Sequence, residues 1–181
     1  MLKLYGQPMP ATPTIAIIDT TFSTIDMGTI VLDQITHAMH DQHRGVDRSY
    51  ALVRRTVPGF KDLTAASRAA IDAGASIVLA CGMPGPEPID ESCAKDASFG
   101  LQMTQALTGV PVLEIFVHMS EALTASNEVD ADTLLRICDG RCRGHADNAI
   151  AMLDAPEVMI ERAGTGRRQG GQDVGPLELL A

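Results

Sequence analysis

The chain has 181 residues, of which 45% are hydrophobic and only 3% aromatic, and its formal net charge is -9 at pH 7. This length and apolar content suffice for one hydrophobic core and give no reason to expect a second. The negative charge argues against a nucleic-acid partner, and without a leader peptide or a spanning apolar run we expect a soluble, cytoplasmic protein with no membrane partner.

The N-terminal part predicts an arm, a strand and a helix. Residues 1–13 contain three prolines and no hydrophobic periodicity, which indicates an extended N-terminal arm. The apolar, β-branched run 14–19 is typical of a strand. Ser23 and Asp26 form an S-x-x-D capping pattern ahead of a helix. The apolar face of that helix consists of Ile30, Val31, Ile35, Ala38 and Met39.

The rest of the chain repeats this alternation of strand and helix. Further strands are expected at 50–57, 76–80 and 112–117. Further helices are expected at 63–73, 90–108 and 130–153, with Gly74 and Gly109 as C-terminal caps of the first two. A polar loop at 119–129 precedes the last helix.

Strands that alternate with helices predict an α/β fold. The expected architecture has three layers, with one four-stranded parallel sheet covered by helices on both faces. The connections are too short for a second domain, so residues 14–163 form a single α/β domain. Residues 164–181 follow it as a Gly/Arg-rich C-terminal tail.

The residues that follow each predicted strand are the candidate binding site. In a parallel sheet all carboxyl ends of the strands meet at one edge, and ligands of open α/β sheets bind in the crevice outside that edge. The residues expected there are Asp19, Thr20, Thr21, Phe22, Ser23, Pro58, Gly59, Phe60, Lys61, Asp62, Gly82, Met83, Pro84, Gly85 and His118. The sequence therefore predicts one site built from four strand ends.

The side chains at this edge suit a planar, polar, uncharged ring system. Phe22 and Phe60 offer stacking faces, while the Gly-Pro turns allow backbone groups to approach a ligand closely. Lys61 and Asp62 are catalytic candidates that can pair or can hold opposite ends of a polar chain. His118 is the natural acid/base candidate, because an unperturbed imidazole titrates near neutrality.

Each of these interpretations has a plainer alternative. Asp19 could accept backbone N–H bonds of the following helix instead of binding a ligand. Lys61 and Asp62 could form an ordinary surface pair, and a lone histidine after a strand is often structural.

No metal or cofactor is expected. The four cysteines have no C-x-x-C spacing, which favours free thiols in a reducing compartment. His37, His40 and His43 recur every third residue, but their polar neighbours favour a solvated helix end over a metal site. The segment GMPG lacks the Lys-Ser/Thr pair of a nucleotide P-loop, so ATP binding is not indicated.

Read in order, the strand-end motifs resemble archaeal-type riboflavin synthases, a family related to lumazine synthases. The matching pieces span residues 16–176, which is essentially the whole domain. They are DTTF with DM three residues on, TVPGFKDL, GMPG followed by Asp90 and by CA and AS, FVH, and the C-terminal RAGTGRRQGGQDVGP.

The resemblance implies a flavodoxin-like sheet, a homopentamer and substrate sites between neighbouring subunits. The implied reaction is a dismutation without redox cofactor or metal, in which two molecules of 6,7-dimethyl-8-ribityllumazine exchange a four-carbon unit and give riboflavin and a ribitylaminopyrimidine. Carried onto this chain, Phe22 would stack on the ring and His118 would move protons. The turns 58–62 and 82–85 would line the pocket, and Arg168 and Gln169 of the tail would reach a neighbour's pocket.

The chain also departs from the family pattern at the rim of this site. Thr24 replaces a basic residue, and Ile89 and Glu91 stand in a segment that is lysine-rich in the family. Met119 and Ser120 follow His118 where the family usually has acidic residues. These changes leave two alternatives beside riboflavin synthesis. One is a paralogous enzyme that acts on another small N-heterocycle or forms lumazine, and the other is a non-catalytic flavin or lumazine carrier.

Overall fold

The computed structural model describes residues 3–4, 7–8, 10, 12–40, 49–168 and 173–176. Its main sheet consists of the four strands β3 (Thr14–Thr20), β4 (Ala51–Val57), β5 (Ile77–Gly82) and β6 (Val112–Phe116). They are all parallel and lie in the order β4-β3-β5-β6, so β4 and β6 are the edge strands. The predicted four-stranded parallel sheet is confirmed.

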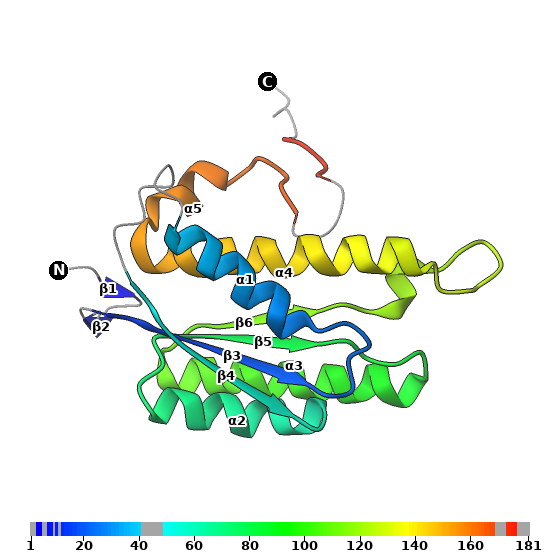
Figure 1. Cartoon of the computed structure of the whole chain (residues 1–181), viewed down its shortest axis with the longest axis horizontal. Helices are drawn as coiled ribbons and strands as arrows, with labels where there is room; N and C mark the ends of the chain where they lie inside the picture. Colours follow the sequence, from blue (N-terminus) through cyan, green and yellow to red (C-terminus); the bar gives the residue numbers. More distant parts are fainter. Residues whose placement is uncertain are drawn as a thin grey trace.

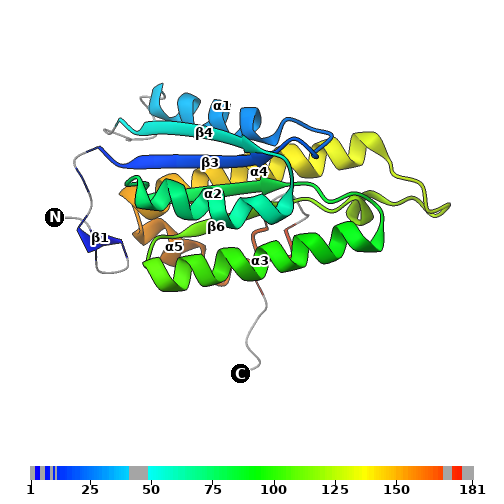
Figure 2. The ribbon, with the colours of Figure 1, turned by 90° about the horizontal axis from the view of Figure 1, so that it is seen from below.

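Four long helices complete a three-layer α/β arrangement. Figure 1 shows α1 (Met27–His40) and α4 (Ala131–Asp154) on one face of the sheet. The opposite face is covered by α2 (Phe60–Asp72) and α3 (Pro88–Thr108), which lie side by side in Figure 2. The strand order and the two helical layers confirm the flavodoxin-like fold class that the sequence predicts.

The central strand β3 shows why its sequence is an unbroken apolar run. Ile15 and Ile17 pack into the core under α1 and α4, whereas Ala16 and Ile18 pack into the core under α2 and α3. Successive strand residues point to opposite faces, so a strand buried on both faces needs apolar residues at every position.

Two helix starts differ from the sequence prediction. The carboxylate of Asp26, not the Ser23 hydroxyl, caps α1, because it accepts the backbone N–H of Thr29 at 3.0 Å. Helix α2 begins at Phe60 rather than at residue 63, since the Asp62 carboxylate accepts the N–H of Gly59 at 3.1 Å and starts the helix earlier. At the other ends the prediction is confirmed, since Gly74 and Gly109 have φ values of 100° and 68°.

Four short elements were not foreseen. The segment predicted as a loop at 119–129 contains the 3₁₀ helix η2 (Met119–Ala122), and α5 (Glu157–Arg162) follows α4. Within residues 1–13, where an extended arm is expected, β1 (Lys3–Leu4) and β2 (Gln7–Pro8) form an antiparallel pair. Within the described ranges, no helix combines the length and apolarity needed to cross a membrane.

Candidate functional site

The carboxyl ends of all four strands meet at one edge of the sheet, as the arrowheads in Figure 1 show. The candidate residues nevertheless do not form a single site within one chain. Those that line a cavity are divided between two cavities that share the first turns of α3: Asp90 and Cys93 line one of them, while Glu91 and Ser92 line the other.

The first cavity, here called the Phe22 cavity, lies outside β3 and β4. It has a volume of about 350 Å³, which falls within the range of small-molecule sites. Its lining residues are Phe22, Pro58, Gly59, Phe60, Lys61, Asp62, Asp90 and Cys93. Six of these eight residues were singled out from the sequence.

The two phenylalanines of this cavity differ in what they can offer a ligand. Phe60 is only 5% exposed and makes an edge-to-face contact with Phe116 at a centroid distance of 4.9 Å. A Cβ atom at Gly82 would lie 2.6 Å from Cζ of Phe60, so the glycine makes room for that ring. Phe22 is 52% exposed. Phe22 is therefore the ring with an open stacking face, whereas Phe60 packs in the core.

Lys61 and Asp62, the two charged candidates in the first turn of α2, have different environments. Asp62 is committed to capping α2 through the N–H of Gly59. Lys61 is exposed at the cavity and forms no ion pair with any described residue, so the pairing of Lys61 with Asp62 does not occur. Lys61 remains available to a ligand.

Hydroxyl groups fix the loop at residues 21–26 that carries Phe22, here called the Phe22 loop. Thr20 Oγ1 and Ser23 Oγ lie 2.9 Å apart, and Ser23 Oγ also accepts the backbone N–H of Met83 at 3.1 Å. The Thr21 hydroxyl donates to the carbonyl of Pro58 at 3.1 Å. These bonds join the loop to the turns after β4 and β5, which positions Phe22 before any ligand arrives.

The GMPG turn contributes backbone more than side chains. The Met83 side chain is fully buried in the core, and Pro84 is buried as well. A Cβ atom at Gly85 would overlap the Asp90 carboxylate and lie 3.3 Å from the Phe22 ring. The glycine thus allows the turn to approach both side chains that it faces.

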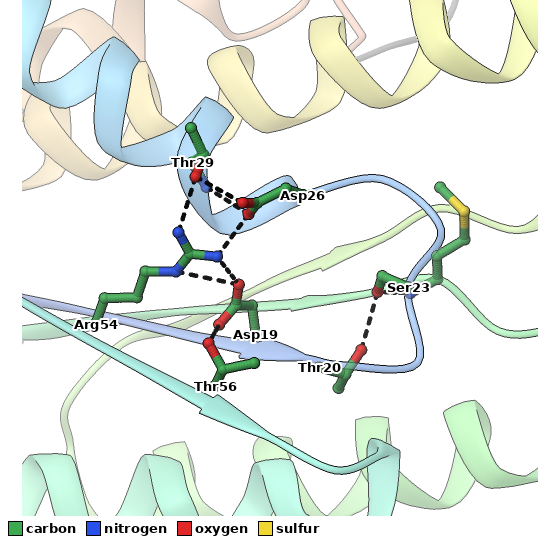
Figure 3. A network of polar contacts seen from close by, with 8 residues as sticks. Asp19, Thr20, Ser23, Asp26, Thr29, Arg54 and Thr56 are labelled. Atoms are coloured by element: carbon green, nitrogen blue, oxygen red, sulfur yellow. Dashed lines mark hydrogen bonds and ion pairs between the residues drawn. The ribbon is translucent and has the colours of Figure 1, made fainter.

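A buried ion pair holds the base of the Phe22 loop (Figure 3). Asp19 is almost fully buried and receives two hydrogen bonds from the guanidinium group of Arg54, as well as the hydroxyl of Thr56 at 2.7 Å. Arg54 also bonds Asp26 at 2.5 Å and the Thr29 hydroxyl at 2.8 Å. Both oxygens of Asp19 are bonded to side chains of the chain itself.

This network lowers the pKa of Asp26, its exposed member. Desolvation would raise the pKa of the Asp26 carboxyl, but the N–H and hydroxyl of Thr29 and the guanidinium group of Arg54 together lower it. The carboxylate thus keeps its charge for Arg54 and for the first turn of α1.

The second cavity, here called the His118 cavity, lies at the edge strand β6 between α3 and α4. Its volume is about 830 Å³. Its lining residues are Glu91, Ser92, Ala94, Lys95, Ser98, Glu114, Phe116, His118, Arg141 and His145. The sequence prediction placed only His118 among these residues in the site.

His118 is oriented by a carboxylate from another element. Its Nδ1 atom lies 2.6 Å from Oε2 of Glu91 on α3. Because a carboxylate only accepts hydrogen bonds, Nδ1 carries the proton of this bond, and the lone pair of the neutral ring is on Nε2. An imidazole oriented in this way is suited to remove a proton from a substrate. Glu91 thus supplies the acidic neighbour that Met119 and Ser120 do not.

A second carboxylate fixes the backbone of the same turn. Glu121 accepts the N–H of His118 at 3.0 Å and is gripped by both Nη atoms of Arg141 at 2.6 Å. Arg141 also donates to the carbonyl of Phe116 at 2.6 Å. Partial burial would raise the pKa of Glu121, but the bonds from Arg141 and His118 outweigh it and lower the pKa. The turn after β6 is therefore tied to α4.

Other sequence candidates lie apart from both cavities. The backbone N–H of the exposed Arg168 bonds the Asp173 carboxylate at 2.7 Å, and Arg168 lines neither cavity. Gln169 lies outside the described residues. All four cysteines are free thiols, and the described residues contain no cluster of three side chains arranged to hold a metal ion.

Sequence reasoning missed the partners that come from far along the chain. Arg54, Arg141 and His145 do not follow a strand, and no motif marks them. Glu91 was noted only as a departure from the family pattern. The one available signal was the pair of charged residues Arg54 and Arg55 in the middle of a strand, and of these only Arg54 forms an ion pair within the described residues.

Comparison with known proteins gives a consistent set of relatives. A riboflavin synthase of Methanothermobacter marburgensis is 43% identical over 165 residues, which cover 90% of this chain and 98% of that protein. Riboflavin synthases of Archaeoglobus fulgidus and Aeropyrum pernix are 35% and 34% identical, again over about nine-tenths of this chain and 97% of theirs. No protein-family model matches the chain.

Proposed function

The chain belongs to the archaeal-type riboflavin synthase family, and from this membership we propose that it forms riboflavin from two molecules of 6,7-dimethyl-8-ribityllumazine. The reaction transfers a four-carbon unit between the two molecules and releases a ribitylaminopyrimidine. The similarity over nine-tenths of the chain carries this proposal. The departures at the rim do not favour another function, because Thr24 donates to the sulfur of Met83 and Glu91 pairs with His118.

The His118 cavity is where protons are moved. The transfer requires a proton to leave a ring methyl group of one lumazine, and Nε2 of His118 is the basic atom that the Glu91 contact leaves free. Glu91 then stabilises the imidazolium cation that forms. The proton returns to substrate atoms later in the transfer, so His118 ends each cycle as it began.

The Phe22 cavity supplies stacking and anchoring. The open face of Phe22 suits a pteridine ring, and the polar backbone of the turn 58–62 suits the hydroxyl groups of the ribityl chain. Lys61 is the cation available there for an electron-rich oxygen of the substrate.

A dismutation needs two substrate molecules near each other, which favours a site shared between subunits. Within one chain the two cavities open on different sides of the start of α3. Helix α3 also exposes the large apolar side chains of Phe99, Met103 and Leu107, which are spaced four residues apart. We propose a homo-oligomer in which the Phe22 cavity of one subunit faces the His118 cavity of its neighbour. The family resemblance implies that this oligomer is a pentamer.

Two measurements test this function. Purified protein incubated with 6,7-dimethyl-8-ribityllumazine is expected to form riboflavin and the pyrimidine in equal amounts. Stoichiometric flavin binding without turnover would identify a carrier instead. Light scattering at micromolar concentration is expected to give an oligomer, and a monomer would contradict the shared site.

A further inference from the structure

A second histidine lines the His118 cavity, and none of the motifs indicated it. His145 lies on α4, one helical turn after Arg141, and Arg141 holds the turn that follows β6. The two histidines thus reach the same cavity from different elements, His118 from the end of β6 and His145 from α4.

The two ring nitrogens of His145 have different surroundings. Nδ1 is sealed from solvent and has no hydrogen-bond partner in the described part of the chain. Nε2 is not among the buried polar atoms without a partner, and no hydrogen bond to it occurs within the described residues. Nε2 is therefore the nitrogen that solvent or a ligand can reach through the cavity.

The charge and tautomer of this ring follow from its burial. Burial, and next the neighbouring Arg141 cation, lower the pKa of His145 to about 4, so the ring is neutral at pH 7. A proton on Nδ1 would bury an unpaired N–H donor, which folded proteins avoid more strictly than an unpaired acceptor. The proton therefore belongs on Nε2. His145 presents a neutral N–H donor to a cavity that also contains Glu91, Lys95, Glu114 and His118.

We propose that Nε2–H of His145 donates a hydrogen bond to a ring carbonyl oxygen or ring nitrogen of the lumazine and stabilises the negative charge that develops there. This inference rests on the proposed function. When His118 takes a proton from the ring methyl group, the electron pair of the broken C–H bond spreads over the conjugated ring to its heteroatoms. A fixed donor beside such a heteroatom strengthens its bond as the charge grows, and a neutral donor keeps its proton while doing so.

Three substitutions separate this role from a structural one. His145→Gln places an amide N–H near the position of Nε2, His145→Asn places one near Nδ1, and His145→Leu removes both. We expect His145→Leu and His145→Asn to lower kcat for riboflavin formation by about 10²-fold. His145→Gln is expected to lose less than about 10-fold of the wild-type rate, since it retains a donor at the cavity.

Binding and stability measurements complete the test. Calorimetry with 6,7-dimethyl-8-ribityllumazine is expected to give nearly the wild-type Kd for all three variants, because the donor acts mainly on charge that appears during reaction. His37→Gln on the exposed face of α1 is the control and should behave as wild type. Thermal melts report folding, and if His145→Leu does not fold, the comparison of Gln with Asn decides.

The outcomes distinguish this inference from the function on which it rests. Equal turnover in the Gln and Asn variants, or wild-type turnover in His145→Leu, would overturn the role of His145 and leave riboflavin synthesis intact. Wild-type protein that binds the lumazine without turning it over would overturn the function and this role with it. A loss of kcat in Asn but not in Gln would support the donor at Nε2.

Discussion

The Phe22 loop and the turn after β6 that contains His118, here called the His118 turn, leave the same edge of the sheet but are held in different ways. The Phe22 loop is fixed mainly by bonds to the turns beside it and by the buried pair of Asp19 with Arg54 on the adjacent strand. The His118 turn depends on Glu91 of α3 and Arg141 of α4. One region is built by neighbouring strands and the other by helices packed across the sheet edge.

The two regions are therefore suited to two different tasks. The Phe22 loop presents an exposed ring on a rigid base, as a binding platform requires. The His118 turn places an imidazole ring against the Glu91 carboxylate, which orients the ring for proton transfer. Substitutions in the two regions should therefore change different measured quantities, and the following predictions test that separation.

The largest effect is expected at His118. His118→Gln removes the titratable ring and should slow riboflavin formation by about 10²–10⁴-fold. Lumazine binding measured by calorimetry should stay near wild type, since an amide retains the size and polarity of the ring. Glu91→Gln should show a smaller decrease, because it only weakens the orientation of the ring. An unchanged turnover number in His118→Gln would leave Lys61 or the substrate itself as the proton carrier.

Arg54 is expected to control stability instead of chemistry. Arg54→Met leaves the buried Asp19 carboxylate without its cation, and breaking such a pair from one side costs about 3–5 kcal/mol in the free energy of unfolding. Arg68→Met is the matched control, because the Arg68–Asp72 pair is exposed on α2 and such pairs contribute about 0–1 kcal/mol. Urea titrations of both variants give the comparison. Equal stabilities would mean that the buried pair does not hold the Phe22 loop.

The sequence predicted the layers of this fold because they depend on local patterns. Apolar runs, helix periodicity and the glycines at positions 74 and 109 all act over a few residues, and the structure has the elements that they indicate. The predicted cap of α1 was wrong, since Ser23 fits the capping pattern but its hydroxyl accepts the backbone N–H of Met83. A contact 60 residues away overrides a local rule, and no pattern in the sequence reveals it.

The parts of the site that the sequence predicted also depend on local features. Residues of the Phe22 cavity follow strands directly, so a parallel sheet brings them together. The division into two cavities was not foreseen, because it depends on how α3 sits across the edge of the sheet. The partners Glu91, Arg141 and His145 come from the packing of α3 and α4 against β6, which a single sequence does not specify.

The protonation of His145 predicts how stability depends on pH. The pKa of this buried ring is lowered from 6.5 to about 4. As the pH falls from 6.5 towards 4, the unfolded chain binds a proton at this residue that the folded chain does not bind. The free energy of unfolding should fall by up to about 3 kcal/mol from this residue alone.

The variant His145→Gln isolates that contribution. Its free energy of unfolding should fall less between pH 7 and pH 4 than that of the wild type, and denaturant titrations at several pH values measure the difference. Parallel curves for the two proteins would show that His145 titrates alike in the folded and unfolded chain, and would contradict a neutral, buried ring.

Two glycines next to Phe60, one in sequence and one in space, should respond differently to the same substitution. Gly82→Ala would place a Cβ atom 2.6 Å from Cζ of Phe60, and overpacking of this kind costs about 1–3 kcal/mol. Gly59 has an extended φ of -159° and open space around its missing side chain, so Gly59→Ala should change stability by less than about 0.5 kcal/mol. Denaturant melts compare the two. A loss at Gly59 as large as that at Gly82 would show that the position of the Phe60 ring is not the cause.

The smallest effect is expected at Phe22, and it should appear in binding only. Phe22→Ala removes the open stacking face and should weaken lumazine binding by about 1–2 kcal/mol, or about 5–30-fold in Kd. Its free energy of unfolding should change little, because half of the ring is already exposed. Phe60→Ala is the control within the same cavity, and it should lower the free energy of unfolding by about 3–5 kcal/mol because that ring is buried.

A third substitution at this position separates stacking from simple apolar contact. Phe22→Leu keeps much of the apolar surface but loses the flat π face, so its Kd should lie close to that of Phe22→Ala if the ring stacks on the pteridine. A Kd equal to the wild-type value would mean that any apolar side chain suffices. In that case Phe22 would only exclude water from the cavity, and orientation of the pteridine would depend on Lys61 and the backbone of the turn 58–62.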